Sequence, residues 1–142
     1  GVGKDADNLY ITCKVKDGEL YSGGQGTQKG SGVFIYLDTK NECLKEPAEG
    51  VYKVWCSYKG DITVWQGNKG KWENSELEGL QITPSVVSGG YELAFTIPLN
   101  RSFNKDAMRL CATLSTKTYT ETLVHSNADR SCTWMKMNLG GH

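Results

Sequence analysis

The sequence predicts an all-β protein, an antiparallel β-sandwich of the jelly-roll or immunoglobulin-like type. Short segments alternate apolar and polar residues along most of the chain, which is the period of a half-buried strand. Gly, Pro and Asn clusters separate these segments and act as turn signals. No stretch spaces its apolar residues as an amphipathic helix does. Many short strands divided by turns are typical of two packed antiparallel sheets.

The expected strands follow one another without an internal repeat or a linker, so we expect one domain over residues 1–142. Pro84 should end the strand at 80–83, which places that strand near a sheet edge. The segment 22–32 is rich in Gly and should form a flexible loop, and the polar segments 39–50 and 67–75 should also be loops. The expected strands are residues 8–15, 33–38, the two halves of 51–66, 80–83, 91–97, 108–115, 117–124 and 134–139.

Residues 51–66 (VYKVWCSYKGDITVWQ) are the clearest β-hairpin candidate, because two β-branched and aromatic runs flank Lys59-Gly60. A three-residue loop over 59–61 would place Trp55 directly opposite Trp65. A two-residue loop would instead place Trp65 beside Val54. We prefer the three-residue loop because it keeps the apolar residues of both strands on one face.

The other face of this hairpin carries two tryptophans among polar residues, so it is either a binding platform or is covered by a second layer. Leaving a large aromatic side chain in water forgoes roughly 1.5–3 kcal/mol of burial. If the neighbouring strands lie side by side, the same face extends over Tyr10, Thr12 and Lys14 and over Phe34 and Tyr36. Trp72 lies in a polar segment and either fills the core or stands at a binding rim. The candidate ligand-binding residues are therefore Trp55, Trp65, Lys53, Phe34, Tyr36 and Trp72.

Charge and composition argue against several functions. The 16 basic and 16 acidic residues balance, which is not the footprint of a nucleic-acid-binding protein. No apolar run reaches the length of a membrane span. No spacing pairs two carboxylates for acid–base work, and His125 has no Ser or Cys partner in its pattern, so we do not expect an enzyme. The chain opens almost directly into a strand without a signal peptide, so we expect a mature fragment or an excised domain.

Five cysteines leave at least one thiol unpaired within the chain. No two cysteines have the spacing of a zinc site. Cys43 and Cys132 lie near expected loops and could be bridged if the protein is exported, but the sequence alone does not decide this.

The sequences of several expected strands resemble those of the family 9 carbohydrate-binding modules, whose fold is related to that of DOMON domains. These segments are DADNLYITCKVKD, GVFIYLDT, YKVWCSY and GGYELAFTIPL, and the similarity runs from about Asp5 to Leu139. The aromatic residues that enclose a sugar in that family have no counterpart before Val33 or before Trp134. Lys53 does match a basic residue of the family's strand. The sugar-contacting residues are therefore taken from this chain's own aromatic face.

The resemblance implies a non-catalytic module that binds glycans or polysaccharides. It also implies attachment to a larger multidomain protein that degrades or captures glycans, extracellular or at the cell surface. Structural calcium, frequent in that family, would be sought at Asp38 and Asp17, whose alternative role is that of solvated turn residues. The competing hypothesis is a structural or interaction domain of the same fold that has lost sugar binding.

Overall fold

The computed structural model describes residues 1–21, 30–115, 120–122 and 130–139, which form strands and one short 3-10 helix. None of the helical segments in this part of the chain is long and apolar enough to cross a membrane. The elements are β1 (Val2–Lys4), β2 (Asn8–Lys16), β3 (Gly32–Asp38), β4 (Val51–Ser57), β5 (Ile62–Asn68), β6 (Lys71–Asn74), β7 (Gln81–Val87), β8 (Gly90–Pro98), β9 (Ala107–Ser115), β10 (Thr120–Thr122), η1 (Ser131–Thr133) and β11 (Met135–Asn138).

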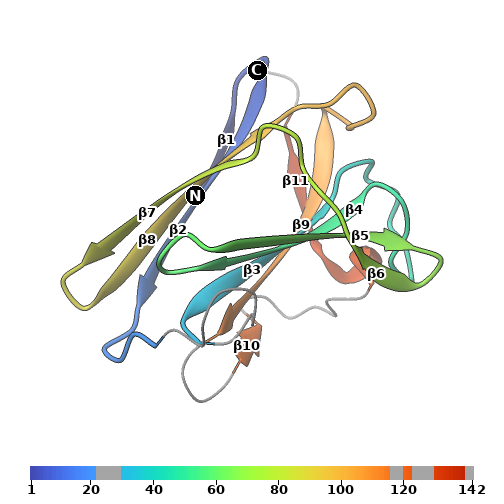
Figure 1. Ribbon diagram of the computed structural model, residues 1–142. Coiled ribbons are helices and arrows are strands. Elements are labelled where there is room, and N and C mark those ends of the chain that lie inside the picture. The colour runs from blue at the N-terminus through green and yellow to red at the C-terminus, as the bar shows by residue number, and fades with distance from the viewer. Residues whose placement is uncertain (22–29, 116–119, 123–129, 140–142) are drawn as a thin grey trace.

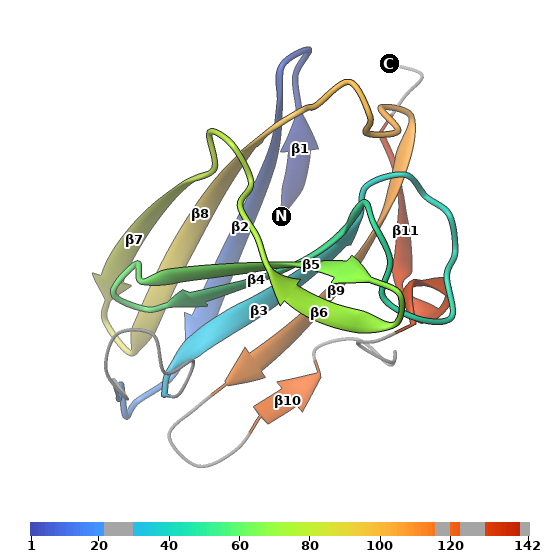
Figure 2. The ribbon, with the colours of Figure 1, turned by 45° about the vertical axis from the view of Figure 1, so that its right-hand side comes forward.

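The strands form two antiparallel sheets, which confirms the predicted β-sandwich. One sheet has the order β1-β2-β8-β7. The other runs β10-β9-β3-β4-β5-β6, and β11 also pairs with β9. Figures 1 and 2 show the two sheets as layers, with β3, β4 and β5 running across the direction of β2, β7 and β8.

The core lies between the sheets and is filled by the alternating residues that the sequence predicts. In β8, Tyr91, Leu93, Phe95 and Ile97 are each at most 2% exposed. The inward residues of β2 and β3 pack against them in one continuous cluster. Burial of this apolar surface, at about 25 cal/mol per Å², is the main source of stability.

The β4–β5 hairpin has the predicted faces but a different register. Trp55 pairs with Thr63, and Trp65 pairs with Lys53, so the two tryptophans are not directly opposite each other as predicted. The loop comprises residues 58–60, because the Ser57 hydroxyl accepts hydrogen bonds from the amides of Lys59 (3.2 Å) and Asp61 (3.1 Å). This changes the pairing by two residues, which leaves every side chain on its predicted face.

Other element predictions need correction. Residues 67–75 are not a loop, because β6 pairs with β5 there. Pro84 does not end its strand: it lies inside β7, which pairs only with β8 in the described part of the chain and is an edge strand as predicted. Tyr10 lies in the four-stranded sheet and cannot extend the face of the hairpin. Residues 22–29 and most of the expected strand at 117–124 lie outside the described residues.

The polar segment 39–50 is fastened to η1 and to the β5–β6 hairpin. Cys43 and Cys132 form a disulfide, which settles the pairing that the sequence left open. The amide of Leu44 donates to the Ser131 hydroxyl (2.6 Å), and the amide of Cys132 donates to the Leu44 carbonyl (2.9 Å). At its other end the segment lies so close to Gly67 that a Cβ there would be 2.7 Å from the carbonyl oxygen of Ala48. The segment is therefore held at both ends.

Candidate functional site

The sequence-predicted binding residues come together on one face. The inward residues of β3 and β4 belong to the core between the sheets, so the alternate residues point away from the four-stranded sheet. We call this the outer aromatic face. It comprises Phe34 and Tyr36 from β3, Lys53 and Trp55 from β4, Trp65 from β5 and Trp72 from β6, together with Trp134 before β11.

The Lys53 ammonium lies at the centre of the outer aromatic face. Its Nζ is 4.9 Å from the ring centroid of Trp65 and 5.1 Å from that of Phe34. It is 5.7 Å from the centroid of Tyr36 and 5.9 Å from that of Trp72. Rings within about 6 Å attract a cation through their quadrupoles, by roughly 0.5–1 kcal/mol per contact at exposed sites. Lys53 therefore holds rings from three other strands around one charged hydrogen-bond donor.

The rings differ in how much surface they offer to a ligand. Phe34, Trp65 and Trp72 are half-buried, whereas Tyr36 is 6% exposed. Trp55 is only 3% exposed, so the expectation that it stacks on a ligand needs correction. Its ring centroid lies 4.8 Å from that of Phe34, which it supports from within the protein.

A glycine in β3, Gly32, explains why Trp55 can be buried. A Cβ at Gly32 would lie 2.8 Å from Trp55 Cζ2 and 2.6 Å from the carbonyl oxygen of Cys56. The absent side chain therefore creates the space in which the indole lies across the sheet. Trp55 belongs to the support of the face, and the exposed part is formed by Phe34, Trp65 and Trp72.

Trp134 is part of this face, although the sequence did not single it out as a binding residue. It is 3% exposed, and its ring centroid lies 5.8 Å from that of Tyr36. It joins Tyr36, Val51 and Cys111 in a second apolar cluster on the outer side of the sheet. The sequence does hold a signal for this position. Trp134 alternates with Met135 and Met137, and Met137 is in the core, so Trp134 points to the outer side of the sheet.

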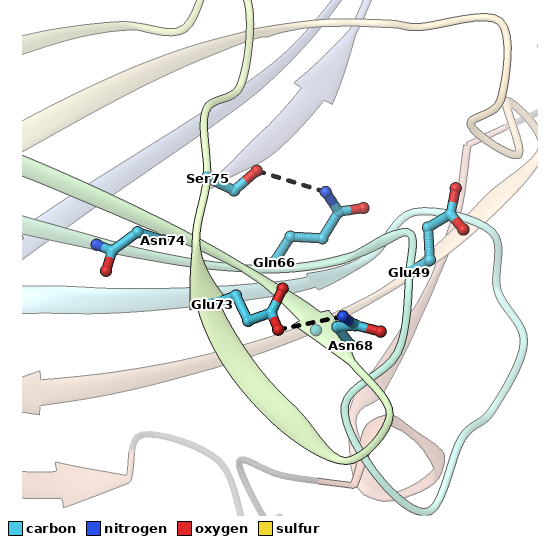
Figure 3. A pocket seen from close by; sticks show the side chains of 7 residues that line it. Glu49, Gln66, Asn68, Glu73, Asn74 and Ser75 are labelled. Carbon is cyan, nitrogen blue, oxygen red and sulfur yellow. Dashed lines mark hydrogen bonds between the residues drawn. The ribbon is translucent and has the colours of Figure 1, made fainter.

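A polar pocket of about 310 Å³ lies at the edge strand β6, on the side of the sheet opposite the outer aromatic face. Gln66 pairs with Tyr52 and with Glu73, so its side chain points to the core side, as that of Tyr52 does. Figure 3 shows Gln66 and Asn68 from β5, Glu73 from β6 and Ser75 just after β6, with Glu49 approaching from the segment 39–50. Asn74 lines the pocket as well, and it pairs with Trp65 across the β5–β6 ladder. The pocket therefore gathers amide, carboxylate and hydroxyl groups on the core side of β5 and β6, away from the aromatic rings.

Much of the hydrogen-bonding capacity of this pocket is already used. Gln66 Oε1 accepts from the amide of Gly50 (3.0 Å), and Gln66 Nε2 donates to the Ser75 hydroxyl (3.4 Å). Asn68 Nδ2 donates to Glu73 (3.1 Å), as the dashed line in Figure 3 shows. These bonds fix the shape of the pocket.

The two candidate calcium ligands lie at opposite ends of β3, a strand about 20 Å long at 3.3 Å per residue. Asp38 is fully buried, and its two oxygens accept from the amides of Glu42 (3.2 Å) and Cys43 (3.0 Å). Asp17 accepts from the Ser31 hydroxyl (2.9 Å). Calcium needs 6–8 oxygen ligands. No three His, Cys, Asp or Glu side chains gather in the part of the chain described, so neither residue belongs to a cluster of carboxylates there.

The strongest pKa shifts concern groups in the core. Burial raises the pKa of the Cys56 thiol to about 12, and it also raises that of the Tyr91 hydroxyl. Both shifts favour the neutral forms, so these groups are poor nucleophiles and bases near pH 7. What the outer aromatic face can do chemically is bind: it offers ring faces and one ammonium donor.

Comparison with solved structures places this architecture among known folds. No protein-family model matches the sequence, and no curated protein sequence does either. A carbohydrate-binding module of family 9 from Caldicellulosiruptor kristjanssonii, in complex with cellotriose, superposes with a TM-score of 0.80 over 99% of this chain and 73% of that chain. The chain has the fold of the family 9 carbohydrate-binding modules.

A second structure of a family 9 module from the same organism, in complex with glucose, gives a TM-score of 0.79 and covers 99% of this chain and 75% of that one. Both are 14% identical to this chain in sequence. The predicted resemblance to the family 9 fold is therefore confirmed for the backbone.

Proposed function

We propose that residues 1–142 act as one non-catalytic module that binds glycans through the outer aromatic face. The observation that carries this proposal is the arrangement around Lys53, where an ammonium group lies among rings from neighbouring strands. The C–H faces of a sugar ring pack on aromatic rings, while its hydroxyl groups accept hydrogen bonds from a side chain such as Lys53. The fold shared with modules solved with cellotriose and glucose supports the same ligand class.

In this proposal Trp65 and Trp72 provide the stacking surface, and Lys53 donates a hydrogen bond to a sugar hydroxyl group. Phe34 lies between these two rings and the buried Trp55. Asn74 pairs with Trp65 and so lies on the same face, where it contacts the next part of the ligand. Trp55 and Tyr36 contribute by holding these groups in place. A rigid surface loses little conformational entropy on binding.

The proposed setting is extracellular or cell-surface, as part of a larger multidomain protein that degrades or captures glycans. The Cys43–Cys132 disulfide supports an oxidising compartment. Structural calcium at Asp38 or Asp17 stays a prediction, and the amide donors around Asp38 do not favour it.

The alternative is a structural or interaction domain that has kept the fold without binding sugar. The burial of Trp55 favours it, because one of the two tryptophans expected on the surface serves packing instead. Titration calorimetry with cellotriose separates the two functions. We expect heat of binding that is lost in Trp65→Ala and Trp72→Ala and kept in Tyr10→Ala, which removes an exposed ring from the other sheet. Unchanged affinity in both tryptophan variants would reject the aromatic face as the site.

A further inference from the structure

A larger hollow, of about 630 Å³, opens at one end of the sandwich on the core side of β4. The connections 75–80 and 99–106 border it, and Tyr52 lines it from β4. Figure 2 shows the first of these connections rising from β6 in one sheet to β7 in the other. The volume falls within the roughly 300–1,000 Å³ typical of small-molecule sites.

The hollow has an aromatic wall. The rings of Tyr52 and Phe103 meet edge to face, with centroids 6.2 Å apart and an interplanar angle of 61°. Phe103 is 6% exposed, whereas Tyr52 is half-buried, so the Tyr52 ring is the one a ligand can touch. Leu77 and Leu99 pack against the core and complete the apolar part of the lining.

Polar groups with unused bonding capacity surround this wall. Arg101, Glu76 and Glu78 are exposed, and none of them forms an ion pair or side-chain hydrogen bond within the described residues. Asn100 uses only its oxygen, which accepts from the amide (3.1 Å) and the hydroxyl (3.4 Å) of Ser102. Its amide hydrogens have no partner in the same part of the chain. The polar pocket beside β6 differs, because its amide groups largely bond to neighbouring protein groups.

We propose that this hollow is a second saccharide-binding site, a proposal that takes its ligand class from the proposed function. A sugar unit fits the lining because one of its faces is apolar and its rim carries hydroxyl groups. Tyr52 would take the C–H face, Arg101 and Asn100 would donate to hydroxyl oxygens, and Glu76 and Glu78 would accept from hydroxyl groups. A purely apolar ligand would use only the Tyr52 part of this lining and none of its polar groups.

The two sites lie on opposite sides of β4. Tyr52 points to the core side and Lys53, its neighbour in the chain, to the outer aromatic face, because successive residues of a strand alternate. A single short oligosaccharide therefore cannot occupy both sites. The module would be bivalent, and two sites on one domain raise the avidity for a polysaccharide surface without any new contact.

The test is a ¹H–¹⁵N correlation titration of the protein with cellotriose and, separately, xylotriose. The titrations use a Trp65→Ala protein, in which sugar binding at the outer aromatic face is weakened. Arg101→Ala is then introduced into this Trp65→Ala protein. Lys105→Ala is the matched control, because Lys105 is exposed on the same connection but does not line the hollow. We expect saturable shifts at the amides of residues 76–79 and 99–103. Arg101→Ala should weaken this binding about five-fold or more, and Lys105→Ala should leave it unchanged.

The outcomes separate the two proposals. If residues 76–79 and 99–103 shift and Arg101→Ala weakens the binding, the second site is supported. This holds even if the outer aromatic face shows no shift, a result that would reject that face as the site of the proposed function. Shifts confined to the outer aromatic face of the unsubstituted protein overturn the second site and leave the proposed function standing. No shift at either place overturns both. Equal affinity of the Arg101→Ala and Lys105→Ala variants also overturns the second site.

Discussion

The substitution Gly32→Ala tests how the outer aromatic face is supported. The added Cβ would lie 2.8 Å from Trp55 Cζ2 and 2.6 Å from the carbonyl oxygen of Cys56, whereas ordinary contacts begin near 3.4 Å. Because one of these atoms belongs to the backbone, the strain cannot be removed by rotating a side chain alone. Overpacking of this kind typically costs about 1–3 kcal/mol, and we expect that loss in the free energy of unfolding.

The control is Gly3→Ala, in which the added methyl group meets nothing within 4 Å in β1. Alanine in a strand is favoured over glycine by roughly 0.5–1 kcal/mol, so this variant should be as stable as the parent protein or slightly more stable. Urea denaturation measures both free energies. Tryptophan fluorescence reports displacement of Trp55, and the emission of Gly32→Ala should move to longer wavelength as the indole becomes exposed.

The same displacement should weaken glycan binding, because Trp55 supports Phe34 from 4.8 Å away. Stability and emission in Gly32→Ala that match those of Gly3→Ala would refute the reasoning. In that case Trp55 would not depend on the missing side chain, and its burial would need another cause.

Four further predictions concern other parts of the molecule. Lys53→Met keeps the length of the side chain but removes the charge, so it should lower the stability by about 1 kcal/mol and weaken cellotriose binding; unchanged affinity would contradict the role of the ammonium. Replacing Cys43 and Cys132 by Ser opens a link between residues 89 apart in sequence and should cost about 2–5 kcal/mol in urea denaturation, whereas a loss below 1 kcal/mol would show that the segment is held without it. Asp38→Asn should destabilise the fold equally with calcium and with EGTA, because the carboxylate serves backbone amides; a loss seen only with calcium would instead reveal a bound ion. The Cys56 thiol, with its pKa raised to about 12, stays neutral in the folded protein but ionises in the unfolded chain above about pH 8.5. The free energy of unfolding should therefore be full below that pH and fall by up to about 1.4 kcal/mol per pH unit toward pH 12. A Cys56→Ala variant with the same slope would exclude this thiol as the cause.

The sequence could predict which face each residue occupies, because the alternation of apolar and polar residues determines it. It could not predict the register of the central hairpin, because a change of two residues leaves every face the same. The Ser57 hydroxyl decides the register by accepting two loop amides, and a serine at a strand end carries no such signal alone. The burial of Trp55 was equally hidden, because it depends on a glycine in a neighbouring strand.

The sequence does not predict β6, which follows a tight turn at Lys69-Gly70. Lys69 and Gly70 both have positive φ values, of 49° and 86°, as the two central residues of a tight hairpin turn do. The short strand that follows is mostly polar and lacks a strong alternating pattern, so the sequence predicts a loop around Trp72. A binding role for Trp72 is nevertheless one of the two roles that the sequence predicts, because an isolated tryptophan in a polar segment needs either a core or a ligand.

A crystal structure of the protein with cellotriose would test the central proposal most directly. The account predicts a sugar ring in contact with Trp65 or Trp72, with a hydroxyl group within hydrogen-bonding distance of Lys53 Nζ. A sugar found only away from this face, or an outer aromatic face left without sugar at saturating cellotriose, would contradict it.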